Sequence, residues 1–177
     1  METNNMQDFL LKKQIRKEAM ERISEDYPLT RRMMNDYSRE LDWSKVSRNF
    51  SINWTPELIE DFATFIDWKE FSGCVDEKLL CDEIIEKFKD KWDWAELSGN
   101  RNLKLSYELL DKYIDRWNWG AIIEWRRWDK ENNVFSFDFL KRYQDRIPVD
   151  ELENSVLWSD IIDEEAEAIK KEMLLKS

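Results

Sequence analysis

Apolar and polar positions follow a pattern along this chain that recurs after 25 or 26 residues. Each copy begins with an apolar residue, then Asp or Asn, then Trp: Leu41-Asp42-Trp43, Ile66-Asp67-Trp68, Trp92-Asp93-Trp94 and Trp117-Asn118-Trp119. Another apolar residue follows three positions later: Val46, Phe71, Leu97 and Ile122. Asp and Asn are favoured N-cap residues, and apolar residues flanking such a cap form a hydrophobic staple. The pattern predicts four short helices, each capped by its Asp or Asn.

A second helix is predicted in each copy by apolar residues at spacing i, i+1, i+4 and i+8, which share one face over about three turns. The rows are Leu58, Ile59, Phe62 and Ile66; Ile84, Ile85, Phe88 and Trp92; Leu109, Leu110, Tyr113 and Trp117; and Phe139, Leu140, Tyr143 and Ile147. The N-caps expected for these helices are Thr55, Cys81, Ser106 and Ser136. Gly73 and Gly99 are expected just after two of the short helices, where glycine commonly follows a helix end.

A helix pair of this kind cannot bury its apolar face alone, so stacked neighbours must cover it. We therefore predict an all-α fold, a small α-solenoid of four to five short-helix/long-helix repeats in one structural domain. Residues 1–40 are expected to form N-terminal capping helices, 41–147 the four Trp-containing repeats, and 148–177 a degenerate fifth repeat with an acidic C-terminal capping helix. Two apolar rows at helical spacing support the caps: Leu11, Ile15, Ala19 and Ile23, and Ile162, Ala166, Ile169 and Met173.

The third copy, Asp93-Trp94-Ala-Glu-Leu97-Ser98-Gly-Asn100-Arg-Asn102-Leu103, resembles short helical repeats of the type D-W-x-x-L-S-x-N-x-N-L. Such repeats occur in uncharacterised proteins of bacteria, phages and large DNA viruses. The resemblance covers residues 41–150, with departures at Arg48-Asn49 and at Ile122-Ile123. It implies a repeat scaffold and suggests no catalytic residue.

Composition narrows the function classes. The chain has 177 residues, 28 Lys and Arg against 39 Asp and Glu, a net charge of −11, and no His. The missing His excludes Ser-His-Asp and Cys-His nucleophile pairs and His-ligated zinc. Cys74 and Cys81 are too few for a disulfide framework and are interpreted as reduced core thiols. We expect no catalytic residues, no cofactor and no metal site.

The start of the sequence has no basic segment followed by an apolar run, so no signal peptide is predicted. No stretch of about 18 apolar residues occurs, so no membrane span is predicted either. On these grounds we expect a cytoplasmic protein that does not bind a membrane.

The fourth copy carries an insertion, because Tyr113 and Tyr143 are 30 residues apart where the corresponding residues of the other copies are 25 or 26 apart. Insertions in repeat proteins often lie on the binding face, and Trp and Arg are enriched in binding hot spots. The inserted segment contains four candidate binding residues: Trp125, Arg126, Arg127 and Trp128. The alternative is that these tryptophans close the core and the arginines pair with carboxylates.

The other tryptophans divide into two groups. Trp43, Trp68, Trp94 and Trp119 recur at the start of the predicted helices, which favours a place in the core over a binding array. Trp54 and Trp158 lie outside the recurring positions and are further candidate binding residues.

Acidic side chains concentrate between residues 150 and 167, where no basic residue occurs. The eight are Asp150, Glu151, Glu153, Asp160, Asp163, Glu164, Glu165 and Glu167. Such a surface repels phosphate, which argues against direct nucleic-acid binding, and it suits a basic partner, including a nucleic-acid-binding protein. The alternative is a solvated acidic face that keeps the protein in solution.

Three functions follow from these patterns. The first is a non-enzymatic protein-protein interaction module, a monomeric acidic inhibitor, immunity or adaptor protein that acts on a basic protein. The second is a structural or assembly protein that self-associates. The third is a metal-dependent enzyme that uses carboxylates.

Overall fold

The computed structural model describes residues 2–124 and 134–176, and every regular element in these two segments is a helix, which confirms the all-α class. The elements are α1 (Glu2–Asp26), α2 (Arg31–Asp36), α3 (Trp43–Ser47), α4 (Pro56–Phe62), α5 (Trp68–Cys74), the 3₁₀ helix η1 (Glu77–Leu79), α6 (Asp82–Lys87), α7 (Trp94–Gly99), α8 (Tyr107–Lys112), α9 (Trp119–Glu124), α10 (Phe137–Tyr143), α11 (Val149–Glu153) and α12 (Val156–Leu175). Among the described helices, none combines the length and apolar character needed to cross a membrane.

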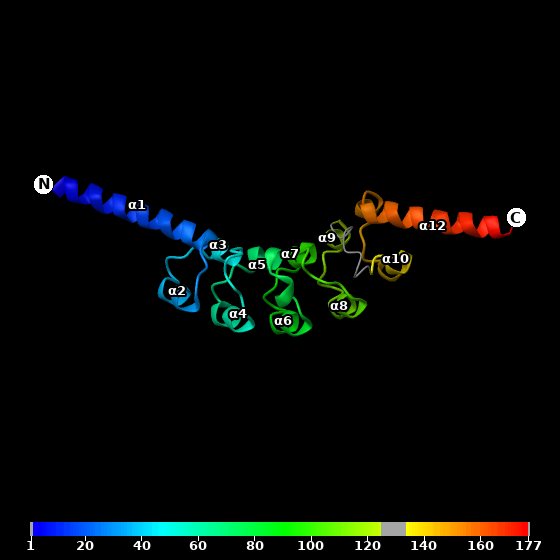
Figure 1. The fold of residues 1–177 in the computed structure, drawn as a ribbon, viewed down its shortest axis with the longest axis horizontal. Coiled ribbons are helices and arrows are strands. Elements are labelled where there is room, and N and C mark those ends of the chain that lie inside the picture. The colour runs from blue at the N-terminus through cyan, green and yellow to red at the C-terminus, as the bar shows by residue number, and fades with distance from the viewer. Residues whose placement is uncertain (1, 125–133, 177) are drawn as a thin grey trace.

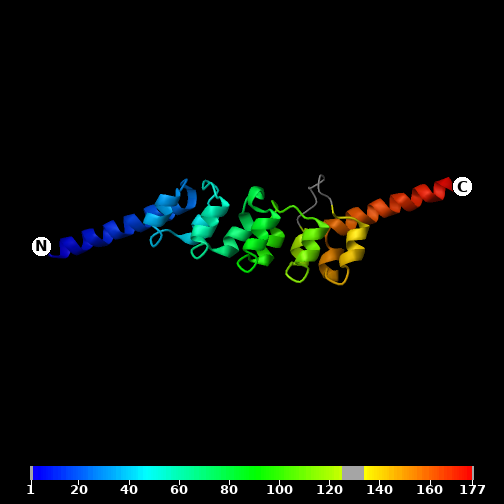
Figure 2. The ribbon, with the colours of Figure 1, turned by 90° about the horizontal axis from the view of Figure 1, so that it is seen from below.

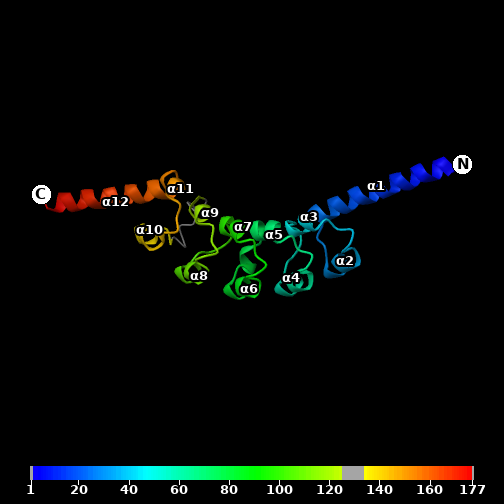
Figure 3. The same cartoon turned by 180° about the vertical axis from the view of Figure 1, so that it is seen from behind.

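Apart from η1 and α11, the helices between the two long terminal ones lie in two rows (Figure 1). The first row consists of α3, α5, α7 and α9, and each of these helices contacts the next. The second row consists of α2, α4, α6, α8 and α10, which Figure 2 shows from below. The terminal helices α1 and α12 contact the two ends of the first row and point away from it in opposite directions, as the view from behind also shows (Figure 3).

The N-caps predicted for the first row are confirmed. Asp42, Asp67 and Asp93 each accept hydrogen bonds from the backbone N–H groups two and three residues further on, at 3.1–3.4 Å. Asn118 accepts one from Ala121 at 3.1 Å. A cap of this kind contributes about 1 kcal/mol, because it pairs N–H groups that the first helical turn leaves free.

The helices of the second row are shorter than predicted. Thr55, Ser106 and Ser136 cap three of them as expected, but all four that follow α2 have only six or seven residues. The chain turns directly after Phe62, whose carbonyl accepts from the N–H groups of Phe65 and Ile66 at 2.8 and 3.0 Å. The last apolar residue of each predicted row therefore lies before the next first-row helix.

Gly73 and Gly99 do not follow their helices as predicted. Both lie inside helices of the first row, and none of the three glycines of the chain, all of them described, has a positive φ. Val75 and Asn100 are the C-cap residues instead, and their N–H groups bind carbonyls within the preceding helix. The backbone at these two positions does not require glycine.

A buried serine joins each helix of the first row to the next. The Ser72 Oγ donates to the Trp68 carbonyl at 2.6 Å and accepts from the backbone N–H of Asp93 at 3.0 Å. We call this pair of bonds the serine clamp; it recurs at Ser24, Ser47 and Ser98, which accept from Asp42, Asp67 and Asn118. Each clamp satisfies the backbone N–H of the next N-cap residue, which has no partner within its own helix.

The clamp series ends after α9. Ile123 stands where the other copies have the serine, and Pro148, the N-cap of α11, stands where they have Asp or Asn. Proline has no N–H, so the junction of Ile123 and Pro148 lacks both the acceptor and the donor of the clamp. Ile123 is buried, and α9 and α11 remain in contact without these bonds.

Aromatic rings connect the two rows. The Trp at the start of each first-row helix packs against an aromatic ring of the second row, with centroids 4.6–5.4 Å apart. The pairs are Trp43 with Phe62, Trp68 with Phe88, Trp94 with Tyr113, and Trp119 with Tyr143. Each indole N–H donates to the carbonyl five residues earlier, at 2.8–3.2 Å. The four tryptophans thus pack with the core, as predicted, although the first three are partly exposed.

Ion pairs join successive helices of the second row, or the turns that follow them, along its surface. They include Arg31 with Asp61, Lys87 with Glu60, Lys112 with Glu86, Arg142 with Asp111 and Arg146 with Asp115. Exposed pairs of this kind typically contribute at most about 1 kcal/mol each. Apolar packing and the serine clamps are therefore the main contributions to the association of the helices.

The terminal helices contact the ends of the rows only through their inner turns, so several apolar residues expected on their capping faces are exposed. Leu11 and Ile15 of α1 are 59 and 58 % exposed, and Ile169 and Met173 of α12 are 57 and 68 % exposed. Ile161, at the base of α12, is buried. Helical spacing predicts which side chains share a face, but whether that face is covered depends on a neighbouring element.

Candidate functional site

The inserted segment cannot be placed as a site. Trp125, Arg126, Arg127 and Trp128 lie outside the described residues. Their assignment as binding residues, and the alternative that they close the core, both stay predictions.

The other two candidate tryptophans are half-buried. Trp158 lies at the start of α12 and packs against the core, and its backbone N–H donates to the capping Ser155 at 3.2 Å. Trp54 lies just before α4 and meets the ring of Phe71 edge-on, with centroids 5.2 Å apart. Trp158 therefore contributes to the attachment of α12, whereas Trp54 faces a cavity.

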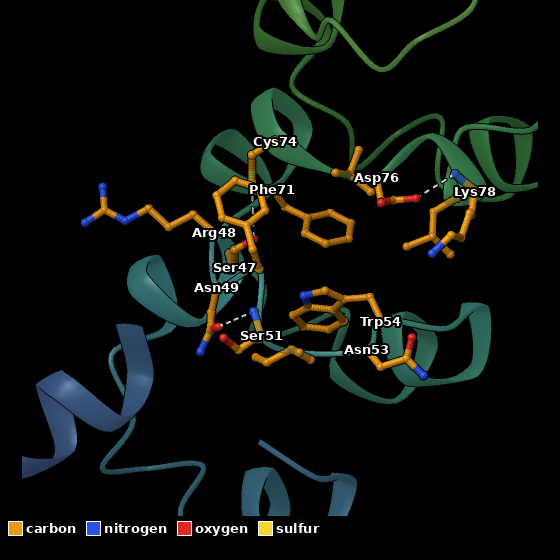
Figure 4. A pocket seen from close by; sticks show the side chains of 14 residues that line it. Ser47, Arg48, Asn49, Ser51, Asn53, Trp54, Phe71, Cys74, Asp76 and Lys78 are labelled. Atoms are coloured by element: carbon orange, nitrogen blue, oxygen red, sulfur yellow. Dashed lines mark hydrogen bonds between the residues drawn. The ribbon is translucent and has the colours of Figure 1, made fainter. Parts of the chain in front are cut away.

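That cavity has a volume of about 250 Å³ and lies between segments of the first two copies (Figure 4). Trp54, Phe71, Val75 and Leu79 supply apolar lining. The charged and polar residues that line it include Arg48, Asn53, Asp76 and Lys78. Pockets for small ligands usually measure roughly 300–1,000 Å³, so this cavity suits a single side chain better than a cofactor.

The cavity lies where a recurring asparagine is replaced. Asn49 and Asn100, two residues after a clamp serine, each donate from Nδ2 to two carbonyls that lie 22 to 28 residues earlier, at 2.9–3.2 Å. Cys74 occupies this position between them, and its Sγ lies 3.6 Å from the Ser47 carbonyl. A thiol cannot replace the two N–H donors of an amide. The loop before Trp54 therefore lacks the hydrogen bonds that an asparagine at position 74 would donate, and Phe50 in this loop is 83 % exposed.

Neither cysteine forms a disulfide, and their surroundings differ. Burial, together with the nearby Glu70 carboxylate, raises the pKa of Cys74 to about 11, so its thiol is neutral at physiological pH and a poor nucleophile. Cys81 is exposed at the N-cap of α6, where it makes no side-chain cap bond. The interpretation of both as core thiols is therefore wrong for Cys81, whose side chain is exposed at the start of α6.

The acidic residues predicted as a binding face lie on two neighbouring helices. Asp150, Glu151 and Glu153 are on α11; Asp160, Asp163, Glu164, Glu165 and Glu167 are on α12; all eight are exposed. Within the described residues Glu167 pairs with Lys170 at 3.1 Å, and the other seven have no ion pair. The Glu151 carboxylate reaches α9, since a Cβ on Gly120 would lie 1.5 Å from its Oε2.

Helix α12 presents an apolar strip with acidic residues beside it. At 100° per residue, Ile162, Ile169 and Met173 fall on one side, and Asp163 and Glu165 lie at the two edges of that side. The three apolar side chains are 45–68 % exposed. Such a surface offers a second helix both apolar contact and negative charge.

The described residues contain no group of three or more His, Cys, Asp or Glu side chains placed to hold a metal ion. Neither Cys74 nor Phe50 is among the site residues expected from the sequence. The sequence signal for this position is the alignment of Cys74 with Asn49 and Asn100.

Comparison with protein-family models, curated proteins and solved structures found no match.

Proposed function

We propose that the two rows form an α-solenoid of four to five repeats, and that this solenoid is a non-enzymatic module that binds a basic protein through α12. The observation that supports this most is the surface of α12. Asp160, Asp163, Glu164 and Glu165 are exposed there without an ion pair to any described residue, beside exposed apolar side chains. In this role the protein is an adaptor or an inhibitor.

The charge and the apolar residues of α12 have separate effects on binding. Unpaired carboxylates attract a basic surface and accelerate its encounter, an effect that salt weakens. Apolar side chains such as Ile169 contribute affinity once they are removed from water, at about 25 cal/mol per Å² of buried apolar surface. The expected partner therefore carries a basic surface with an apolar strip.

The base of α12 is held in place, which favours a docking element over a loose tail. Ile161 is buried, and Leu157 and Trp158 pack against the core. Helix α12 contacts both α9 and α11. A helix fixed at one end loses less conformational freedom on binding than a disordered segment.

The experiment compares two variants with equal changes of charge. Asp163→Asn with Glu164→Gln neutralises two carboxylates of α12, and Glu83→Gln with Asp145→Asn neutralises two exposed ones elsewhere. Tagged protein is used to capture partners from a lysate, and any captured basic protein is purified and titrated against each variant. We expect 1:1 binding that the α12 variant weakens at least tenfold and the control leaves unchanged.

The salt dependence of the same titration is a second readout. Binding to the unmodified chain weakens as ionic strength rises, because salt screens exposed charges beyond about 10 Å at 0.1 M. Equal affinity of both variants, or affinity independent of salt, contradicts the proposed role of α12.

A further inference from the structure

Both terminal helices extend beyond the rows, and they do so by similar lengths. Exposed residues run from Met6 to Ala19 in α1 and from Ile162 to Leu175 in α12. Each stretch has about 14 residues and spans roughly 21 Å at the helical rise of 1.5 Å per residue. The two helices leave opposite ends of the molecule (Figures 1 and 3).

Both extensions expose large apolar side chains. In α1 these are Met6, Phe9, Leu10, Leu11 and Ile15, each 55–61 % exposed. In α12, Ile162, Ala166, Ile169 and Met173 follow one another at spacings of four, three and four, and Ile162, Ile169 and Met173 are at least 45 % exposed. This spacing is that of a coiled-coil seam, which needs a second helix to cover it.

The charges of the two extensions are opposite. Residues 6–19 carry four basic and two acidic side chains, net +2, and residues 162–175 carry two basic and five acidic ones, net −3. Two α12 helices would therefore repel each other more than α12 and α1 would. Complementary charge favours the pairing of unlike helices.

The directions of the helices also fit. Going from N- to C-terminus, α12 leads away from the rows and α1 leads toward them. When two molecules follow each other along the long axis, α12 of the first and α1 of the second run parallel. Leu11 and Ile15, four residues apart on α1, can then face the seam of α12.

From the exposed seam, the opposite charges and the matching directions, we infer that α12 of one molecule binds α1 of a second copy, so that the chain assembles head to tail. The inference rests on the proposed function, because it uses the same surface of α12 and takes the basic residues of α1 in a second copy as the surface that α12 binds. The contact joins two different surfaces, so it leaves a free α1 at one end and a free α12 at the other. Assembly therefore continues beyond a dimer as concentration rises.

A charge exchange tests the pairing by light scattering at increasing protein concentration. One variant carries Lys12→Glu and Lys13→Glu, and another carries Glu164→Lys and Glu165→Lys. Each alone is expected to stay at the monomer mass of 21.7 kDa, whereas an equimolar mixture, or all four changes in one chain, restores the growth seen with the unmodified protein. Unmodified protein that stays at 21.7 kDa at every concentration, or single variants that assemble as it does, overturns the inference.

A second pair of variants tests whether α12 pairs with α1 of another copy and not with another α12. Leu11→Glu with Ile15→Glu blocks α1, and Ile162→Lys with Ile169→Lys blocks α12. All four side chains are exposed, so circular dichroism should show unchanged helix content. Head-to-tail pairing predicts that each blocked chain is monomeric and that their mixture stops at a 1:1 dimer, since only one working contact remains. A chain with blocked α1 that dimerises alone overturns the inference, because α12 would then pair with itself.

The two proposals fail in different ways. A chain that stays monomeric but captures a separate basic protein through Asp163 and Glu164 overturns head-to-tail assembly and supports the proposed function. A chain that passes both mass tests supports the assembly, with or without a further partner. A chain that neither assembles nor captures a basic protein contradicts both.

Discussion

The Ser72 Oγ accepts a hydrogen bond from the backbone N–H of Asp93 at 3.0 Å. Through this bond a side chain near the end of α5 supplies a hydrogen-bond acceptor for the backbone N–H at the start of α7. The two helices also contact each other. Ser72 has no exposed surface, so water cannot replace the bond. The links from α3 to α5, from α5 to α7 and from α7 to α9 therefore each depend on one serine hydroxyl.

Ser72→Ala should destabilise the fold by about 1–3 kcal/mol, because it leaves the Asp93 N–H without a partner in a buried place. Urea denaturation monitored by circular dichroism measures the change. Ser159→Ala, on the exposed surface of α12, should stay within about 0.5 kcal/mol. Equal denaturation midpoints for Ser72→Ala and Ser159→Ala would show that the clamp contributes nothing to the free energy of unfolding.

Cys74→Asn should stabilise the fold by about 1 kcal/mol. The new amide occupies the position of Asn49 and Asn100 and can donate to the Ser47 and Phe50 carbonyls. The comparison is with Cys74→Ala, which removes the thiol and adds no donor. A lower denaturation midpoint for the Asn variant than for the Ala variant would contradict this role of the recurring asparagine.

Acid should weaken the contact around Glu86. Its carboxylate accepts from Lys89 at 2.7 Å, Tyr113 at 2.5 Å and Lys112 at 2.9 Å. These bonds, that of Lys89 foremost, lower the pKa of Glu86 to about 2 from 4.5. A lowered pKa stabilises the fold above the unfolded value, and this contribution is lost as pH falls from about 4.5 through about 2.

Thermal unfolding between these two pH values measures the effect. As the pH falls, the Tm of the unmodified protein should decrease more than the Tm of Glu86→Gln, because the glutamine side chain has no carboxylate to protonate. Glu83→Gln removes a carboxylate of the same helix without those three bonds and should behave as the unmodified protein. Parallel Tm curves for the unmodified protein and Glu86→Gln would refute the assignment.

Thiol labelling should distinguish the two cysteines. Cys81 is exposed, whereas Cys74 is partly buried and its pKa is raised to about 11. With iodoacetamide near neutral pH, peptide mass spectrometry should find Cys81 alkylated first, since the thiolate is the reacting form. Cys81→Ser protein should then react slowly. Faster alkylation of Cys74 than of Cys81 would contradict the partial burial of the Cys74 thiol.

The local features of the fold could be predicted from the sequence. The caps at Asp42, Asp67 and Asp93 depend on side chains within three residues of the bonds they make, so a short motif contains all the information. The clamp could have been predicted too. Serine recurs at Ser47, Ser72 and Ser98, in each case five positions after the capping Asp.

Features that depend on distant neighbours could not be predicted. The row from Leu11 to Ile23 indicates one helix face, but its exposure follows from the absence of a described element beside the outer half of α1. The cavity beside Trp54 required knowing which carbonyls the asparagines reach, 22 to 28 residues away. The candidate residues around Trp125 stay predictions.

Because the clamp is missing between Ile123 and Pro148, we expect the helices before and after this junction to unfold locally as separate units. Helices α3, α5, α7 and α9 are linked by the serine clamps, whereas α11 and α12 are held to α9 by packing and by surface contacts. Proteins open in such contiguous units, each with its own free energy. Amide hydrogen exchange should therefore be faster from Val149 onward than in the clamped helices. A partner on α12 would slow exchange in that last unit and leave the others unchanged.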